Sequence, residues 1–169
     1  MKLPQRVTLC EVGTRDGFQI EPDWIPTDLK VEVVDRLSAT GVPRIEVTSF
    51  VSPKAIPALR DAEEVMARIH RRPGTRFSAP VPNDNGSVRA VDARVDEIHT
   101  VVSASESHNL ANVNMSIAES LVKLRATLEV AHRAGVPVYS GISCSFGCPF
   151  ETDVPVARLG SARQRTPVL

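Results

Sequence analysis

The sequence predicts an α/β fold in which parallel strands alternate with helices. Three observations support this prediction: β-rich runs recur along the chain, most are followed by apolar residues at helical spacing, and glycine or proline separates them. The length of 169 residues is typical of one domain, and 42% apolar and 24% charged residues lie near the globular norm. Wholesale disorder is therefore not expected.

Five short runs rich in β-branched residues are predicted to be strands, and turn-forming residues lie between them. The third run contains prolines, which remove backbone donors and limit its length. The predicted strands cover residues 7–12, 45–50, 77–82, 97–102 and 136–143.

Four segments with helical spacing lie between these runs. The clearest begins at Ser116, which is predicted to form a capping box with Glu119, and its apolar stripe continues to Gly135. Thr27 is predicted to cap the first helix, and Gly41 is predicted to end it. The predicted helices cover about residues 27–40, 58–70, 87–93 and 116–134.

Strands that alternate with helices pair in parallel through right-handed crossovers. Two architectures fit, an open doubly wound sheet and part of a (β/α)8 barrel. The turn after the first strand has no GxGxxG or Walker A pattern, and it places Arg15 and Asp16 where barrel enzymes carry their chemistry. We therefore predict a partial (β/α)8 TIM barrel over residues 1–156, with about five βα units of eight, and an irregular tail over residues 157–169.

Composition excludes several classes of partner. The 20 basic and 20 acidic side chains give a net charge of zero, which argues against a nucleic-acid or membrane-surface partner. No apolar run approaches the roughly 20 residues that span a bilayer, and no secretory or transit leader is recognisable. An odd count of three cysteines favours a reducing compartment, so a cytoplasmic location is expected. Cys144 and Cys148 lack a second pair of ligands, so no structural zinc site is predicted.

Polar side chains gather within or just after the predicted strands. In parallel α/β folds the carboxyl ends of the strands meet at one mouth, so these side chains could line a single pocket. The set comprises Arg15, Asp16, Glu46, Thr48, Ser49, Asn83, Ser103, Ser105, Glu106, Asn109, Ser143 and Ser145.

Arg15, Asp16 and Glu46 are the strongest candidates for chemistry. The carboxylate of Asp16 suits a hard divalent cation such as Mg²⁺ or Mn²⁺. The guanidinium of Arg15 suits capture of a carboxylate or of a developing enolate oxygen. The alternative that the Arg–Asp pair merely fixes a turn stays open. Glu46 is flanked by apolar residues, so it is either buried and paired or inward-facing and functional.

Four segments stand in the order found in one enzyme family. They are VGTRDGFQ (12–19), EVTSFVSPK (46–54), SASESHN (103–109) and SCSFGCPF (143–150). Together they resemble 3-hydroxy-3-methylglutaryl-CoA lyase, of the metal-dependent TIM-barrel lyase and synthase superfamily, over about residues 7–156. Residues 49–54 separate this resemblance from the superfamily's synthases, which condense acetyl-CoA with a 2-oxo acid.

The resemblance implies retro-Claisen cleavage of 3-hydroxy-3-methylglutaryl-CoA to acetoacetate and acetyl-CoA, as in leucine degradation and ketone-body formation. It implies that Asp16 is a metal ligand, that Arg15 binds substrate and stabilises the enolate oxygen, and that Glu46 orients this centre catalytically. It also implies that Gln19, Asn109 and Ser143 line the substrate pocket.

The family's His-x-His metal pair and catalytic cysteine follow its seventh and eighth strands, beyond the five units predicted here. The Mg²⁺ or Mn²⁺ site is therefore expected to be incomplete, and the chain truncated and inactive, or nearly so, alone. Two alternatives are kept. One is a non-catalytic remnant that completes its sheet as a homo-oligomer, since exposed strand edges invite association. The other is a synthase of the same superfamily that condenses acyl-CoA.

Overall fold

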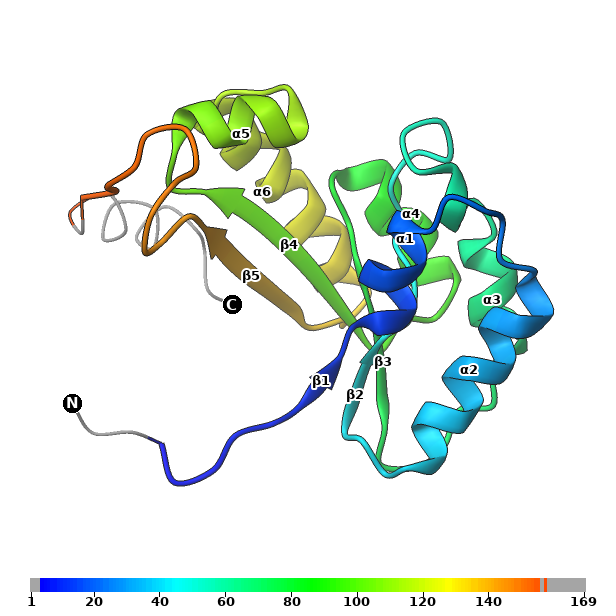
Figure 1. Cartoon of the computed structure of the whole chain (residues 1–169). Coiled ribbons are helices and arrows are strands. Elements are labelled where there is room, and N and C mark those ends of the chain that lie inside the picture. The colour runs from blue at the N-terminus through cyan, green and yellow to red at the C-terminus, as the bar shows by residue number, and fades with distance from the viewer. Residues whose placement is uncertain (1–3, 156, 158–169) are drawn as a thin grey trace.

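A five-stranded parallel sheet forms the centre of the molecule (Figure 1). The computed structural model describes residues 4–155 and residue 157. The strands lie side by side in chain order, and every neighbouring pair is parallel. This order confirms the predicted half-barrel, because an open doubly wound sheet reverses its strand order at a switch point. The strands are β1 (Cys10–Glu11), β2 (Arg44–Glu46), β3 (Arg76–Pro80), β4 (Glu97–Ser103) and β5 (Val138–Ser143).

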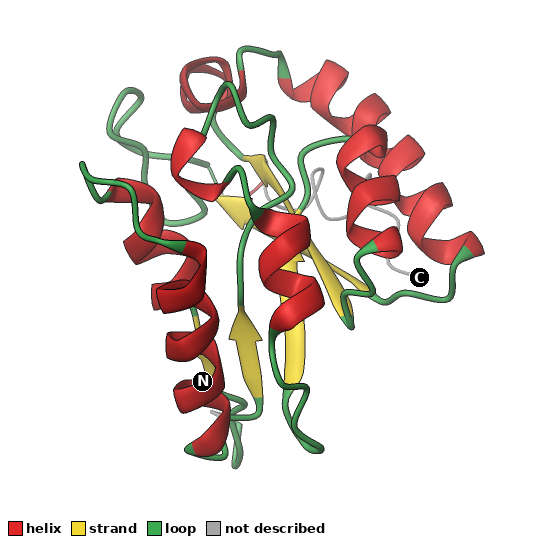
Figure 2. Cartoon of the chain, turned by 90° about the vertical axis from the view of Figure 1, so that its right-hand side faces the viewer, coloured by secondary structure: helices red, strands yellow, loops and turns green. Residues whose placement is uncertain are grey.

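Helices cover one face of the sheet, and Figure 2 shows them in front of the strands. A π-helical turn (Gly13–Gly17) follows β1, and a 3-10 turn (Pro57–Leu59) precedes α3. The helices are α1 (Phe18–Ile20), α2 (Thr27–Ala39), α3 (Ala62–Arg68), α4 (Asp84–Asp92), α5 (Glu106–Val113) and α6 (Ile117–Arg133). No helix in the described part of the chain is long and apolar enough to cross a membrane.

The hydrophobic core lies between the sheet and these helices. Ile45, Phe77 and Ile98 point from the three central strands into the core, where Val34 of α2 and Met66 of α3 meet them; each is at most 1% exposed. Burial of one such side chain contributes about 1.5–3 kcal/mol. Because side chains alternate along a strand, the neighbouring residues point to the other face.

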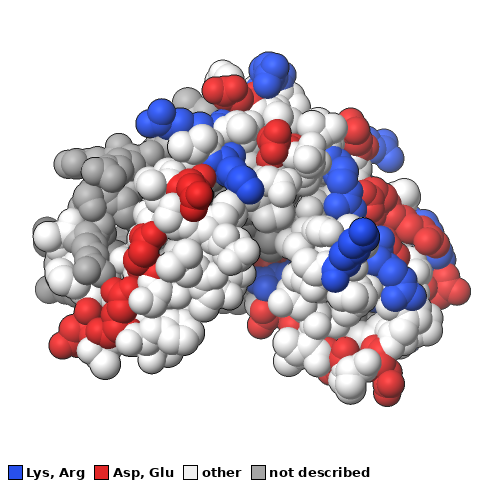
Figure 3. Space-filling view, turned by 90° about the horizontal axis from the view of Figure 1, so that it is seen from above, with Lys and Arg blue, Asp and Glu red and all other residues white. Residues whose placement is uncertain are grey.

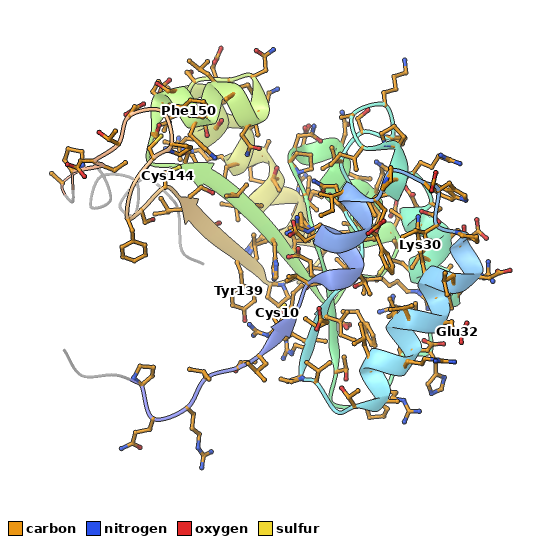
Figure 4. The ribbon with its side chains drawn as sticks, in the orientation of Figure 1. Cys10, Lys30, Glu32, Tyr139, Cys144 and Phe150 are labelled. Carbon is orange, nitrogen blue, oxygen red and sulfur yellow. The ribbon has the colours of Figure 1, made fainter. Side chains whose placement is uncertain are left out.

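No helix within residues 4–155 covers that other face, which is the concave interior of the half-barrel. Val101 on β4 is 51% exposed and Tyr139 on β5 is 44% exposed there. Figure 4 shows Tyr139 and Cys10 on this uncovered side of the sheet. Figure 3 views the molecule from the end toward which the strands lead, and it shows a notch between two lobes of the surface.

Four of the five strands are shorter than predicted: β3 ends at Pro80, β5 begins at Val138, and the differences are largest for β1 and β2. β1 covers only Cys10–Glu11 of the predicted 7–12, because it is an edge strand with one neighbour and residues before it are exposed. β2 ends at Glu46, although residues 47–50 stay buried. There Val47 and Phe50 still donate their backbone N–H groups to carbonyl oxygens of Ser78 and Pro80, at 2.9 and 3.0 Å.

Besides the short α1, which was not predicted, the helices differ from the prediction in four respects. The hydroxyl of Thr27 does not cap α2 but donates to Asp61 Oδ2 at 2.7 Å. The segment predicted as one helix over 58–70 is a 3-10 turn followed by α3. α4 begins before residue 87, because Asn83 caps it by accepting a hydrogen bond from the Gly86 N–H. α5 was not predicted, since its sequence has no apolar stripe.

The other two predicted helix signals are confirmed. Ser116 and Glu119 form the capping box of α6, and Gly41 after α2 has a φ of +81°, the left-handed conformation that favours glycine. Apart from Ala157, the tail predicted at 157–169 lies outside the described residues.

Candidate active site

The π-helical turn after β1 fixes the first two candidate residues. The carbonyl oxygen of Val12 accepts hydrogen bonds from the N–H groups of Arg15 and Asp16, at 3.0 and 2.7 Å. The buried hydroxyl of Thr14 donates to the carbonyl oxygen of Glu46 at 2.9 Å and so ties the turn to β2. The backbone of the turn and the end of β2 are therefore held together, and the two side chains of Arg15 and Asp16 project beside Glu46.

Arg15 bridges two carboxylates. Its Nε donates to Glu46 Oε1 at 2.5 Å, and its Nη1 donates to Asp16 Oδ1 at 2.8 Å. The Glu46 side chain is 5% exposed, Arg15 is 24% exposed and Asp16 is 62% exposed. The site therefore runs from a buried carboxylate, through a cation, to a carboxylate that reaches solvent. The structure brings together the three residues that the sequence singled out for chemistry.

A fourth side chain, His99 of β4, completes this group. Its Nδ1 lies 2.6 Å from Glu46 Oε2, so each oxygen of the Glu46 carboxylate has its own partner. Burial raises the pKa of Glu46, but the hydrogen bond to His99 and the charge of Arg15 outweigh burial, and the net pKa is lowered. The Glu46 carboxylate is therefore held in its charged form.

Sequence reasoning did not single out His99. A signal was present, because His99 alternates with Ile98 and Thr100, and Ile98 points into the core. Period-two alternation then places His99 on the concave face. The contact with Glu46 itself joins residues 53 positions apart and needs the arrangement of the strands.

The remaining predicted pocket residues occupy separate places. Gln19 lies on α1 and lines an open pocket of about 480 Å³ together with Trp24 and Arg60. Ser143 ends β5, beside Ser103 in the strand register. These two residues stay candidates for substrate contact at the same end of the sheet.

Asn109 lies on α5 and is 3% exposed. Its Oδ1 accepts from the Ser103 N–H at 3.1 Å, and its Nδ2 donates to Met115 O at 2.8 Å and Ser120 Oγ at 2.7 Å. These bonds join the end of β4 to the start of α6.

Cys148 is also held in place by hydrogen bonds. Its thiol donates to Ser105 Oγ at 2.9 Å, and its backbone pairs with Thr152. Burial raises the pKa of this thiol, but its hydrogen bonds with Ser105 and with the backbone at Phe150 and Glu151 outweigh burial, so the net pKa is lowered.

The donor set does not by itself form a metal site. Within residues 4–155 and 157, no group of three or more His, Cys, Asp or Glu side chains is placed to hold a metal ion. Asp16 offers one exposed carboxylate, and one of its oxygens accepts from Arg15. Mg²⁺ needs further oxygen ligands in near-octahedral order. The described residues therefore do not fit a complete metal site.

The half-barrel has the architecture of part of an α/β barrel, and its candidate site, with Arg15 and Asp16 after β1 and Glu46 at the end of β2, lies where barrel enzymes carry their chemistry. Residues 6–165 match the HMGL-like family, and the chain belongs to that family. It is 45% identical over 159 residues to a hydroxymethylglutaryl-CoA lyase of Bacillus subtilis, covering 94% of this chain and 53% of the relative. The chain thus spans about half the length of the curated relatives it matches.

Solved structures agree with this membership. The chain superposes on a crystal structure of the Bacillus subtilis HMG-CoA lyase with a TM-score of 0.92 at 42% identity, covering 99% of this chain and 57% of that one. It superposes on an Acinetobacter baumannii HMG-CoA lyase, in complex with coenzyme A and 3-methylmalate, with a TM-score of 0.88 at 41% identity, covering 94% of this chain and 52% of that one.

Proposed function

We propose that this chain carries the Arg–Asp–Glu part of the active site of a carbon–carbon lyase that cleaves 3-hydroxy-3-methylglutaryl-CoA. The observation that carries the proposal is the arginine held between two carboxylates at the carboxyl end of β1. Family membership supports the reaction type, and the coenzyme A complex of a related lyase supports an acyl-CoA substrate. Cytoplasmic location stays a prediction, supported by the three free thiols.

The proposed reaction breaks one carbon–carbon bond. The tertiary hydroxyl of the substrate loses its proton, its oxygen becomes the ketone of acetoacetate, and the bond electrons pass to the thioester carbon chain. The resulting enolate then takes up a proton and leaves as acetyl-CoA. Negative charge develops on the thioester oxygen, so a fixed cation beside that oxygen lowers the barrier.

Arg15 is proposed to be that cation. Its Nε is bound by Glu46 and its Nη1 by Asp16, which leaves other guanidinium N–H groups for an oxyanion. Glu46 holds the guanidinium in place at little entropic cost during reaction, because it is buried and already paired. Asp16 reaches solvent and is proposed to be one ligand of Mg²⁺ or Mn²⁺, which would act as a Lewis acid when bound.

The test combines binding with turnover. Purified chain is mixed with Mg²⁺ and 3-hydroxy-3-methylglutaryl-CoA, binding is measured by calorimetry, and acetoacetate is measured enzymatically. We expect measurable binding, and turnover far below that of a complete relative. Arg15→Gln should abolish most of the binding, while Arg36→Gln, an exposed helix residue paired with Glu32, should not change it.

The outcomes separate the alternatives. Binding that Arg15→Gln leaves unchanged, or no binding at all, contradicts the proposed function. Turnover at the rate of a complete enzyme contradicts the predicted inactivity of the chain alone. Condensation of acetyl-CoA with a 2-oxo acid supports the synthase alternative, and a stable homo-oligomer without binding supports the non-catalytic one.

A further inference from the structure

His99 and Glu46 meet across an intervening strand. They lie on β4 and β2, with β3 between them. On β3, Ser78 pairs in register with Glu46, so the two side chains point to the same face. The small, fully buried Ser78 leaves space over β3, and the Glu46 carboxylate reaches across it to His99 at 2.6 Å.

The contact with His99 restricts rotation of the Glu46 carboxylate about its terminal torsion. The terminal torsion of a glutamate is broad, so one hydrogen bond leaves the carboxylate able to turn. Here Oε2 is bound by His99 while Oε1 is bound by Arg15 Nε at 2.5 Å. Because both oxygens are bound, the Glu46 carboxylate has a fixed orientation. Oε1 therefore fixes the direction of the Arg15 guanidinium that donates to it.

His99 is itself held from its other side. The ring of Tyr139 on β5 meets the imidazole edge-on, with centroids 6.0 Å apart. The hydroxyl of Tyr139 accepts from Arg44 Nη2 at 3.0 Å, and Arg44 Nε lies 3.3 Å from the fully buried Glu97. Contacts on the concave face thus run from β5 through β4 to β2, and they orient the imidazole toward Glu46.

We propose that His99 is a positioning residue of the candidate active site, which locks Glu46 and through it aims Arg15 at the substrate. His99 does not touch Arg15 in any hydrogen bond of the described residues, so its action passes through the Glu46 carboxylate. The role toward substrate rests on the proposed function, whereas the alignment of Arg15 is a property of the chain alone.

Two variants of His99 separate positioning from bulk. His99→Phe keeps a ring against Tyr139 but removes the hydrogen bond to Glu46. His99→Asn places an amide N–H near the position of Nδ1 and should restore the bond. His132→Phe, which changes an exposed histidine on α6, is the matched control.

The first readout is the side-chain N–H signal of Arg15 in ¹H–¹⁵N NMR spectra, assigned by its loss in Arg15→Gln. We expect slow exchange of this proton with water in the unmodified chain, at least tenfold faster exchange in His99→Phe, and recovery in His99→Asn. Unchanged exchange in His99→Phe, with the fold intact by circular dichroism, overturns the proposal. If His99→Phe does not fold, the exchange rate of the Arg15 side-chain proton is compared between His99→Asn and Glu46→Gln. Equal rates in these two chains overturn the proposal.

The second readout is calorimetric affinity for 3-hydroxy-3-methylglutaryl-CoA. We expect about tenfold weaker binding in His99→Phe, equivalent to about 1.4 kcal/mol, with His99→Asn near the unmodified chain. Equal affinity in all three chains overturns the role toward substrate. If the unmodified chain binds no acyl-CoA, the proposed function fails, while the exchange of the Arg15 proton still decides whether His99 aligns it.

Discussion

Replacement of Glu46 by glutamine removes one charge from the candidate site and almost no volume. The Glu46 carboxylate accepts two hydrogen bonds, from Arg15 and His99, and its side chain is 5% exposed. A hydrogen bond that involves a charged group contributes about 1.5–3 kcal/mol, against about 0.5–1.5 kcal/mol for a neutral one. If each of the two bonds is weakened by about 1 kcal/mol, the loss in free energy of unfolding has an upper bound near 2 kcal/mol. A neutral amide is easier to bury, which offsets part of this loss.

We therefore expect Glu46→Gln to lower the free energy of unfolding by about 1–2 kcal/mol at pH 7. In a chain of this size that loss corresponds to a fall of roughly 2–8 °C in melting temperature. Urea denaturation followed by circular dichroism measures it. The control is Glu64→Gln, whose carboxylate is 57% exposed and pairs with Arg68 one helical turn away. An exposed pair of this kind contributes at most about 0.5 kcal/mol.

The same variant tests the sign of the pH dependence. The folded pKa of Glu46 is lowered, so its stabilisation is present above the unfolded value of about 4.3 and is lost as pH falls through the lower folded pKa. The difference between the unmodified chain and Glu46→Gln should shrink below about pH 4. Because His99 and Arg15 both contact the Glu46 carboxylate, the series is repeated in a His99→Asn background. A difference below about 0.5 kcal/mol at pH 7, or one that does not shrink in acid, refutes the reasoning.

Two further substitutions test the packing around the site, both by urea denaturation. Lys30 is 3% exposed and is bound to Asp61 at 2.7 Å, so Lys30→Ala should cost about 3–5 kcal/mol, because it leaves a buried carboxylate without its cation. Arg36→Ala, in an exposed pair, should cost about 0.5 kcal/mol or less, and equal losses would contradict the argument. A Cβ on Gly86 would lie 2.7 Å from a backbone oxygen, so Gly86→Ala should cost about 1–3 kcal/mol. Gly17→Ala meets no atom within 4 Å, and a similar loss there would contradict the steric explanation.

The order of strands and helices could be predicted because it depends on local signals. Apolar residues repeat with a period of two or about 3.6, and each run is bounded by residues with a known capping or turn role. Ser116 and Glu119 show this best, since the capping box predicted from their spacing is present with both hydrogen bonds. The length of β1 could not be predicted, because pairing of an edge strand depends on its neighbour.

α5 was not predicted, for a different reason. Its start is fixed by Ser105, whose hydroxyl accepts from the His108 N–H, and by Asn109, which bonds to the end of β4 and the start of α6. The bond of Ser105 is a local N-cap, whereas those of Asn109 are tertiary contacts with neighbouring elements, and together they replace the apolar stripe by which a helix is usually detected. The contact between Glu46 and His99 is likewise tertiary, and it depends on the small residue between their strands.

The two faces of the sheet contribute differently to the stability of the fold. The helix-covered face gains stability from apolar burial, since Ile45, Phe77 and Ile98 pack there with almost no exposure. The concave face instead holds buried or half-buried charges, whose desolvation offsets most of their attraction. Charges such as Glu46 and Arg15 therefore contribute less to stability than apolar residues of similar size would, which agrees with the role in binding and chemistry proposed for them. It follows that substitutions in the outer core should lower stability without changing the alignment of Arg15, whereas His99→Phe should change that alignment.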